Sequence, residues 1–257
     1  MSKLKSLIVT GDDFGRSSEV NEAIERCHEA GFLTQASLMV NEPAVEEAVR
    51  IARRHPALCV GLHLTLCDGR ASAPSVLTNT AGEFPRSHAR GGFRYAFFRS
   101  LAEPLAREIH AQFEKFRAHG LPPTYWDGHA HLHLNPIILG LTIPFAVERH
   151  FRATRVVREP GRPAVLPWVF DSLSRVAIPA LQRYGIAFAD RTFGLRNTGH
   201  MTTETITRIL ERLPDGLNEL YFHPGAESGN VEAVALARLL EHHGITPRTS
   251  LPPADAR

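Results

Sequence analysis

Short apolar runs alternate with longer segments of helical periodicity along the whole chain. Residues 4–10, 35–40 and 58–66 are short and largely apolar, a pattern typical of buried strands. Segments with helical patterning follow them at residues 17–30, 43–55 and 103–119. Strands that alternate with helices in this way predict an α/β fold built on a parallel sheet.

The alternation continues to the end of the chain. Residues 124–136 predict a fourth strand and its following loop, and further strands are expected at 155–158, 186–189, 218–223 and 245–250. Helices are expected at 136–150, 170–184, 203–213 and 231–243, with Pro144 and Pro179 interrupting two of them. Seven or eight units in 257 residues suit a distorted (β/α) TIM-like barrel better than an open sheet, forming one domain over residues 1–257.

Composition excludes several classes of protein. A formal charge of +2 without basic clusters does not suggest a nucleic-acid-binding protein. Three cysteines without a CxxC pair argue against a disulfide scaffold and for a reducing compartment. The chain shows neither a signal-peptide pattern nor an apolar run near the roughly 20 residues that cross a bilayer. We therefore expect a soluble, cytoplasmic protein.

Residues 124–136 contain three histidines and an aspartate within seven positions. In an extended chain His129, His131 and His133 would share one face, with roots roughly 6.5 Å apart. Because metal–nitrogen bonds are only about 2 Å long, one ion could gather one or two of these rings but hardly three. The pattern favours a metal or acid–base site, and the alternative is a polar strand face.

Unusual polar residues fall where the predicted strands end. In a barrel, the carboxyl ends of the strands carry the active site. The residues at those ends are Asp12, Asp13, His63, Asp127, His129, Arg158 and His223. This common position indicates one shared site.

The residue types at these ends suit hydrolysis. An aspartate with two histidines can hold a divalent ion and leave coordination positions open for water and substrate. Such an ion lowers the pKa of bound water and polarises a carbonyl group. A neighbouring carboxylate can accept the proton of the water, and an imidazole can protonate a leaving amine.

Four motifs carry a resemblance to a known family. They are Gly11-Asp12-Asp13-Phe14-Gly15, Gly61-Leu62-His63-Leu64, Asp127-Gly128-His129-Ala130-His131-Leu132-His133 and Phe222-His223-Pro224. In this order they resemble the YdjC-like carbohydrate deacetylases, and more narrowly the hopanoid-biosynthesis-associated branch. The first four strands match closely, and the C-terminal third matches mainly through His223-Pro224.

The resemblance implies a distorted barrel that removes an N-acetyl group from an amino sugar and releases acetate. It implies that Asp13, His63 and His129 hold a divalent ion, either Mg²⁺ or Zn²⁺. It also implies Asp12 as the general base and His223 as the general acid. A homodimer is expected, and the substrate could be a glycosylated hopanoid lipid.

Several residues keep a second interpretation. Asp12 could only cap a helix or orient a neighbour. Asp127, His131 and His133 are expected to contact substrate or support the ligands, although His131 and His133 could also bind the metal. Arg158 fits either substrate binding or a structural ion pair.

Two other functions remain open. An amidohydrolase-type barrel would act on another amide, although that class usually places His-x-His on its first strand. A non-catalytic barrel could bind a sugar or lipid and keep only the metal.

A long insert is predicted at residues 67–100, after the third strand. It is either a lid over the site or a surface insertion. Within it, the aromatic and arginine residues of 93–98 could rest on a membrane surface, or they could pack inside the insert.

Overall fold

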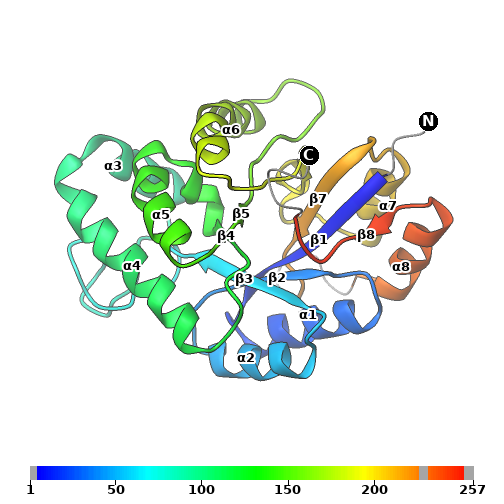
Figure 1. Cartoon of the computed structure of the whole chain (residues 1–257), viewed down its shortest axis with the longest axis horizontal. Coiled ribbons are helices and arrows are strands. Elements are labelled where there is room, and N and C mark those ends of the chain that lie inside the picture. The colour runs from blue at the N-terminus through cyan, green and yellow to red at the C-terminus, as the bar shows by residue number, and fades with distance from the viewer. Residues whose placement is uncertain (1–4, 226–230, 252–257) are drawn as a thin grey trace.

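The computed structural model describes residues 5–225 and 231–251 and shows one parallel sheet with helices ranged around its outside (Figure 1). The strands follow the order β5-β4-β3-β2-β1-β7-β6, and each pair of neighbours is parallel. Their bounds are β1 Lys5–Phe14, β2 Gln35–Leu38, β3 Cys59–Leu64, β4 Tyr125–Gly128, β5 Ala153–Thr154, β6 Arg191–Phe193, β7 Gly216–Phe222 and β8 Thr246–Pro247. The predicted α/β class is confirmed; Leu4, the first residue of the expected strand 4–10, lies outside the described residues.

The helices follow the strands as the sequence pattern predicted. They are α1 Ser18–Glu29, α2 Val45–Arg54, α3 His88–Phe97, α4 Ala102–Ala118, α5 Pro136–Glu148, α6 Val165–Arg183, α7 Thr203–Glu211 and α8 Ala233–His242. Short 3-10 helices are found at η1 Arg99–Leu101, η2 His129–Leu134 and η3 Leu195–Asn197. In the part of the chain that is described, we find no helix that is both long and apolar enough for a membrane span.

The sheet curls until its two edges approach each other. The edge at β5 meets the segment before β6 through a parallel bridge between Ala153 and Ala187. Further along, the Thr192 N–H donates to the carbonyl of Arg158 at 3.4 Å. Strand β8 pairs only with the start of β1. The result is a curled, incompletely closed sheet and not a regular eight-stranded barrel.

The predicted positions of two strands were wrong. The fifth strand was expected at residues 155–158, but β5 covers only Ala153–Thr154. The sixth was expected at 186–189, but β6 covers Arg191–Phe193. Where the two edges of the sheet meet, isolated backbone hydrogen bonds join the neighbouring segments instead of a regular ladder. An apolar run in this region therefore does not by itself mark the position of a strand.

The two prolines do not interrupt their helices. Pro144 lies within α5 and Pro179 within α6, and both helices continue past them. Both rings are exposed. A carbonyl that loses its N–H partner on the solvent side can bind water, which reduces the cost of an internal proline.

Helices cover the outer face of the sheet and create the apolar core. Helix α1 contributes Val20, Ile24 and Cys27, all buried. On the strands, the side chains of Leu62 and Trp126 are completely buried. Strands that are covered on both sides read as nearly continuous apolar runs, which is why they were recognisable in the sequence.

Candidate active site

Asp12 and Asp13 lie at the carboxyl end of β1 and are aimed in different directions. The pairing of β1 with β2 shifts register between Gly11 and Phe14, and Asp13 has φ 65°. An irregularity of this kind re-aims a side chain, and a positive φ is costly for a residue other than glycine. Asp12 therefore reaches one set of partners and Asp13 another.

His63 on β3 and Asp127 on β4 are neighbours in the register of the sheet. His63 Nδ1 lies 2.7 Å from Asp127 Oδ1, and Ser37 Oγ donates to Asp127 Oδ2 at 2.9 Å. Both members of the pair are completely buried or nearly so. A carboxylate at Nδ1 fixes the ring and leaves Nε2 free to face an ion or a substrate.

The three histidines of residues 129–133 do not share one face, because the strand ends before them. Strand β4 stops at Gly128, and His129 begins η2. Ala130 and His131 have φ 52° and 56°, which is the left-handed region. Two successive left-handed residues turn the chain sharply, so the extended geometry that placed the rings together was wrong.

Only His129 of the three turns toward Asp13. His131 Nε2 lies 2.8 Å from the hydroxyl of Tyr221, and His133 Nε2 lies 2.9 Å from the carbonyl of Arg155. Burial holds the pKa of His131 well below its usual range and lowers the pKa of His133 to about 4. Burial thus favours the neutral form of both rings.

Asp13, His63 and His129, hereafter the metal trio, have donor atoms within 4.8 Å of one another. Asp13 Oδ1 lies 3.0 Å from His129 Nδ1 and 3.4 Å from His63 Nε2. Donor atoms that share one zinc ion at about 2.0–2.1 Å are themselves about 3.0–3.4 Å apart. His63 Nε2 is also buried without a hydrogen-bond partner among the described residues. These residues fit a divalent ion.

The charges around the metal trio also fit a cation. Burial alone raises the pKa of Asp13, but His129 and His63 hold it well below its usual range. Burial alone lowers the pKa of His63, but Asp127 raises it to about 10. Four buried carboxyl groups face one buried guanidinium at this end of the sheet: Asp12, Asp13, Asp127 and Glu219 against Arg155. The excess of negative groups favours either protons on the imidazoles or a bound cation.

Arg155 connects the carboxylates and was not recognised from the sequence. Its guanidinium donates to both oxygens of Asp12 at 2.7 and 2.8 Å. It also reaches Asp127 at 2.9 Å and Glu219 at 2.8 Å, and it lies over the ring of Tyr221. A charged residue within an apolar run was the available signal, because arginine is seldom buried without partners.

The insert brings further polar groups to the metal trio. Arg16 bridges Asp13 at 3.4 Å and Asp68 at 3.0 Å, and the His88 ring lies 5.7 Å from that of His129. Cys67 is close enough to join His88 and His129 as a donor group, but burial raises its pKa to about 12. A thiol that stays protonated is a poor nucleophile.

His223 and Arg158, the other two predicted residues, are not members of the metal trio. His223 directly follows β7 and is half-buried, with its ring centroid 6.2 Å from that of Tyr221. Arg158 Nε lies 3.7 Å from Asp171 Oδ1, so its ion-pair partner is on α6.

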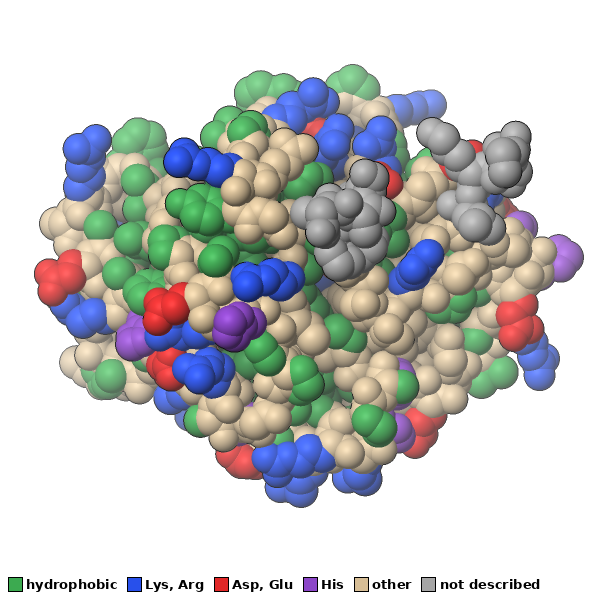
Figure 2. Space-filling model, viewed as in Figure 1, with side chains coloured by type: hydrophobic (Ala, Val, Ile, Leu, Met, Phe, Trp, Pro, Cys, Tyr) green, Lys and Arg blue, Asp and Glu red, His purple; other side chains and the backbone are tan. Residues whose placement is uncertain are grey.

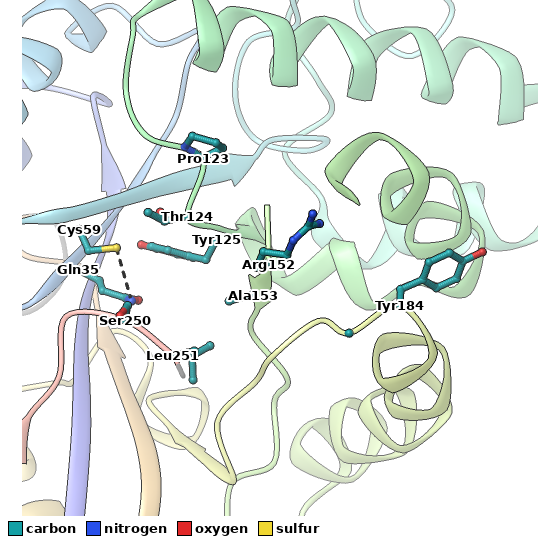
Figure 3. Close-up of a pocket in the computed structure, with 11 residues that line it drawn as sticks. Gln35, Cys59, Pro123, Thr124, Tyr125, Arg152, Ala153, Tyr184, Ser250 and Leu251 are labelled. Carbon is teal, nitrogen blue, oxygen red and sulfur yellow. Dashed lines mark hydrogen bonds between the residues drawn. The ribbon is translucent and has the colours of Figure 1, made fainter. Parts of the chain in front are cut away.

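A cavity lies at the opposite end of the strands. Its volume is about 680 Å³, and Gln35, Cys59 and Tyr125 line it from the amino ends of β2, β3 and β4. Figure 3 shows the Tyr125 ring pointing toward Cys59 and Gln35, with Leu251 facing them from the C-terminal segment. None of the metal trio lines this cavity, so the candidate chemistry does not lie there.

Comparison with known proteins agrees with this architecture. A carbohydrate deacetylase of Brevibacillus brevis is 34% identical over 222 residues, covering 85% of this chain and 80% of the relative. A carbohydrate deacetylase of Geobacillus stearothermophilus is 43% identical over 164 residues, 63% of each chain. A solved structure from Enterococcus faecalis V583, provisionally named a cellobiose-phosphate cleavage protein, has a TM-score of 0.70 at 22% identity. It covers 95% of this chain and 97% of that one, and shows the same fold. The model of the YdjC-like protein family matches residues 6–248, and the chain belongs to that family.

Proposed function

We propose that this protein is a metal-dependent hydrolase that removes the N-acetyl group of an amino sugar and releases acetate. The observation that carries the proposal is the buried metal trio, whose donor atoms lie 3.0 and 3.4 Å apart around Asp13 Oδ1. The relatives named carbohydrate deacetylase support the reaction and the class of substrate. A divalent ion held there would polarise the amide carbonyl and acidify a water molecule.

Asp12 is proposed as the general base. Its carboxylate lies within 4.8 Å of donor atoms of His63 and Asp127, directly beside the metal trio. Arg155 engages one lone pair of each oxygen, which orients the group and leaves further lone pairs to accept a proton. In this role the Asp12 carboxylate would accept a proton from the attacking water and keep it within the site.

His223 is proposed as the general acid that protonates the leaving amine. It directly follows Phe222, which pairs with Gly11 in the sheet, so His223 emerges at the level of the Asp12–Asp13 end of β1. Asp127 supports His63, and His131 and His133 shape the wall of the site through Tyr221 and the Arg155 carbonyl.

The finer identity of the substrate rests on the resemblance of the four motifs to the hopanoid-associated branch. We propose a glycosylated hopanoid lipid as one substrate to be tested beside free sugars. The expected homodimer likewise stays a prediction, which sedimentation equilibrium would check.

Acetate release after metal reconstitution tests the proposed function. The wild type, loaded in turn with Zn²⁺ or Mg²⁺, would be given N-acetylglucosaminyl substrates, both free and lipid-linked. We expect Asp12→Asn to lower kcat by about 10²- to 10⁴-fold while metal binding is retained, because a base is lost but no ligand is. Asp13→Asn should lose both activity and metal.

Other results would point elsewhere. Full deacetylation and retained metal in both Asp13→Ala and His129→Ala would refute the proposal. Metal binding without acetate from any sugar would favour a non-catalytic barrel. Hydrolysis of a different amide would favour the amidohydrolase alternative.

A further inference from the structure

Helix α3 of the insert presents aromatic rings to solvent. Phe93 and Phe97 are 62% and 69% exposed, and their tilted rings lie with centroids 4.5 Å apart; Phe98, directly after the helix, is 54% exposed. Tyr95 of the same helix is buried and donates to the carbonyl of Leu66 at 2.8 Å. The helix is thus anchored by one side, so its phenylalanines remain outside the core. Exposed apolar side chains that cluster usually mark a contact surface.

The charges around these rings are of one sign. The segment between Glu83 and Glu103 contains no acidic residue. Its arginines are Arg86, Arg90, Arg94 and Arg99, and all except the partly buried Arg94 are exposed. Aromatic side chains interleaved with arginines are typical of helices that lie on anionic membranes.

Two neighbouring helices extend this surface. Helix α5 contacts both α3 and α6, and its sequence from Pro136 to Val147 contains no charged residue. On α6, Val165 and Trp168 are 81% and 68% exposed. Figure 2 shows hydrophobic side chains gathered over α5 and α6, with Lys and Arg side chains near them. We call the exposed apolar side chains of α3 and α6, with α5 between these helices, the apolar face.

We propose that the apolar face docks on an anionic lipid surface. Its exposed rings would enter the interface between headgroups and acyl chains, while the arginines of 86–99 would bind lipid phosphates. A second copy of the chain fits this surface less well. In a two-fold contact through α3, the arginines of one copy would face the arginines of the other, and their like charges would repel. A neutral sugar polymer offers them no opposite charge.

The proposed docking also concerns the candidate active site. Helices α3 and α6 both contact η2, the short helix that begins with His129. A membrane held against these helices would lie next to the elements that carry the metal trio. If the proposed deacetylase function is right, lipid-linked N-acetylated sugars become accessible substrates; this consequence rests on that function, but the docking itself does not.

Co-sedimentation with vesicles tests the docking without any substrate. The full chain would be mixed with vesicles of phosphatidylcholine alone or of phosphatidylcholine with phosphatidylglycerol. We expect binding only to the anionic vesicles, and about tenfold weaker binding for the Phe93→Ser, Phe97→Ser variant because apolar burial is lost. An Arg90→Glu, Arg99→Glu variant should also bind about tenfold more weakly and lose most of the salt dependence.

The matched control carries the same kinds of change on another helix. Val234 and Arg238 are exposed on α8, one turn apart, so Val234→Ser, Arg238→Glu should bind vesicles as the wild type does. Circular dichroism melts would verify that all variants fold, and turnover of free sugars should stay unchanged in the phenylalanine variant.

Three results would overturn the docking. The first is that the wild type does not bind anionic vesicles, and the second is that the phenylalanine variant binds them as well as the wild type does. The third is that the wild type forms a dimer, the phenylalanine variant is a monomer, and neither protein binds vesicles. Vesicle binding without deacetylation of any sugar would instead leave the docking intact and refute the proposed function.

Discussion

Arg155 holds Asp12 by two parallel charge-assisted hydrogen bonds of 2.7 and 2.8 Å in the buried interior of the sheet. The same guanidinium contacts Asp127 and Glu219, so one cation orients three carboxyl groups. A planar fork can do this, whereas an ammonium group cannot bind a carboxylate in the same two-point manner.

Replacing Arg155 should therefore destabilise the fold. Arg155→Met leaves buried carboxyl groups without their cation, and we expect a loss of about 3–5 kcal/mol in the free energy of unfolding. Urea denaturation followed by circular dichroism measures it. Arg175→Lys is the control, since the pair of Arg175 with Asp171 is exposed and should change stability by less than about 0.5 kcal/mol. Unchanged stability of Arg155→Met would refute the role of Arg155.

The metal trio predicts one high-affinity divalent site. Isothermal titration of chelator-treated protein with Zn²⁺ should show it in the wild type and not in His129→Gln, which removes a donor ring. Glu25→Gln is the control. It changes a separate and more exposed cluster of possible ligands, Glu25, Glu29 and His55, and should leave the affinity of the metal trio for Zn²⁺ unchanged. Equal affinity in wild type and His129→Gln would exclude His129 as a ligand.

Asp127 should act through His63 on metal affinity. Asp127→Asn weakens the 2.7 Å contact with His63 Nδ1, and we expect metal affinity to fall about 10- to 100-fold. Ser37→Ala removes only one hydrogen bond to Asp127 and should have a smaller effect. Isothermal titration of both variants shows which one loses more metal affinity. A larger loss of metal affinity in Ser37→Ala than in Asp127→Asn would contradict this role of Asp127.

Gly61 should be required by the packing of Tyr125. A Cβ atom at Gly61 would lie 2.5 Å from the buried Tyr125 ring, so we expect Gly61→Ala to cost about 1–3 kcal/mol. At Gly140 on α5 a Cβ atom meets nothing within 4 Å, and Gly140→Ala should stabilise the helix by up to about 1 kcal/mol. Thermal melts of the two variants should therefore shift in opposite directions.

The strand-end rule anticipated part of the candidate site. Asp13, His63 and His129 are far apart in sequence, yet parallel strands bring their carboxyl ends to one edge, and the structure places the three within 4.8 Å. His131 and His133 share the His-x-His spacing with His129, and the sequence left open whether they also bind the metal. The left-handed residues Ala130 and His131 sent these two rings to other partners, and no pattern of residue types revealed that turn.

The sequence by itself determined the α/β class, because covered strands and amphipathic helices must show their periodicity in the chain. Tertiary structure alone decided that Arg155 joins Asp12, Asp127 and Glu219. These residues come from β1, β4, β7 and the segment after β5, and only the curl of the sheet brings them together. Contacts across a curled sheet depend on register and curvature, which are set by the packing of the whole molecule and not by any local run of residues.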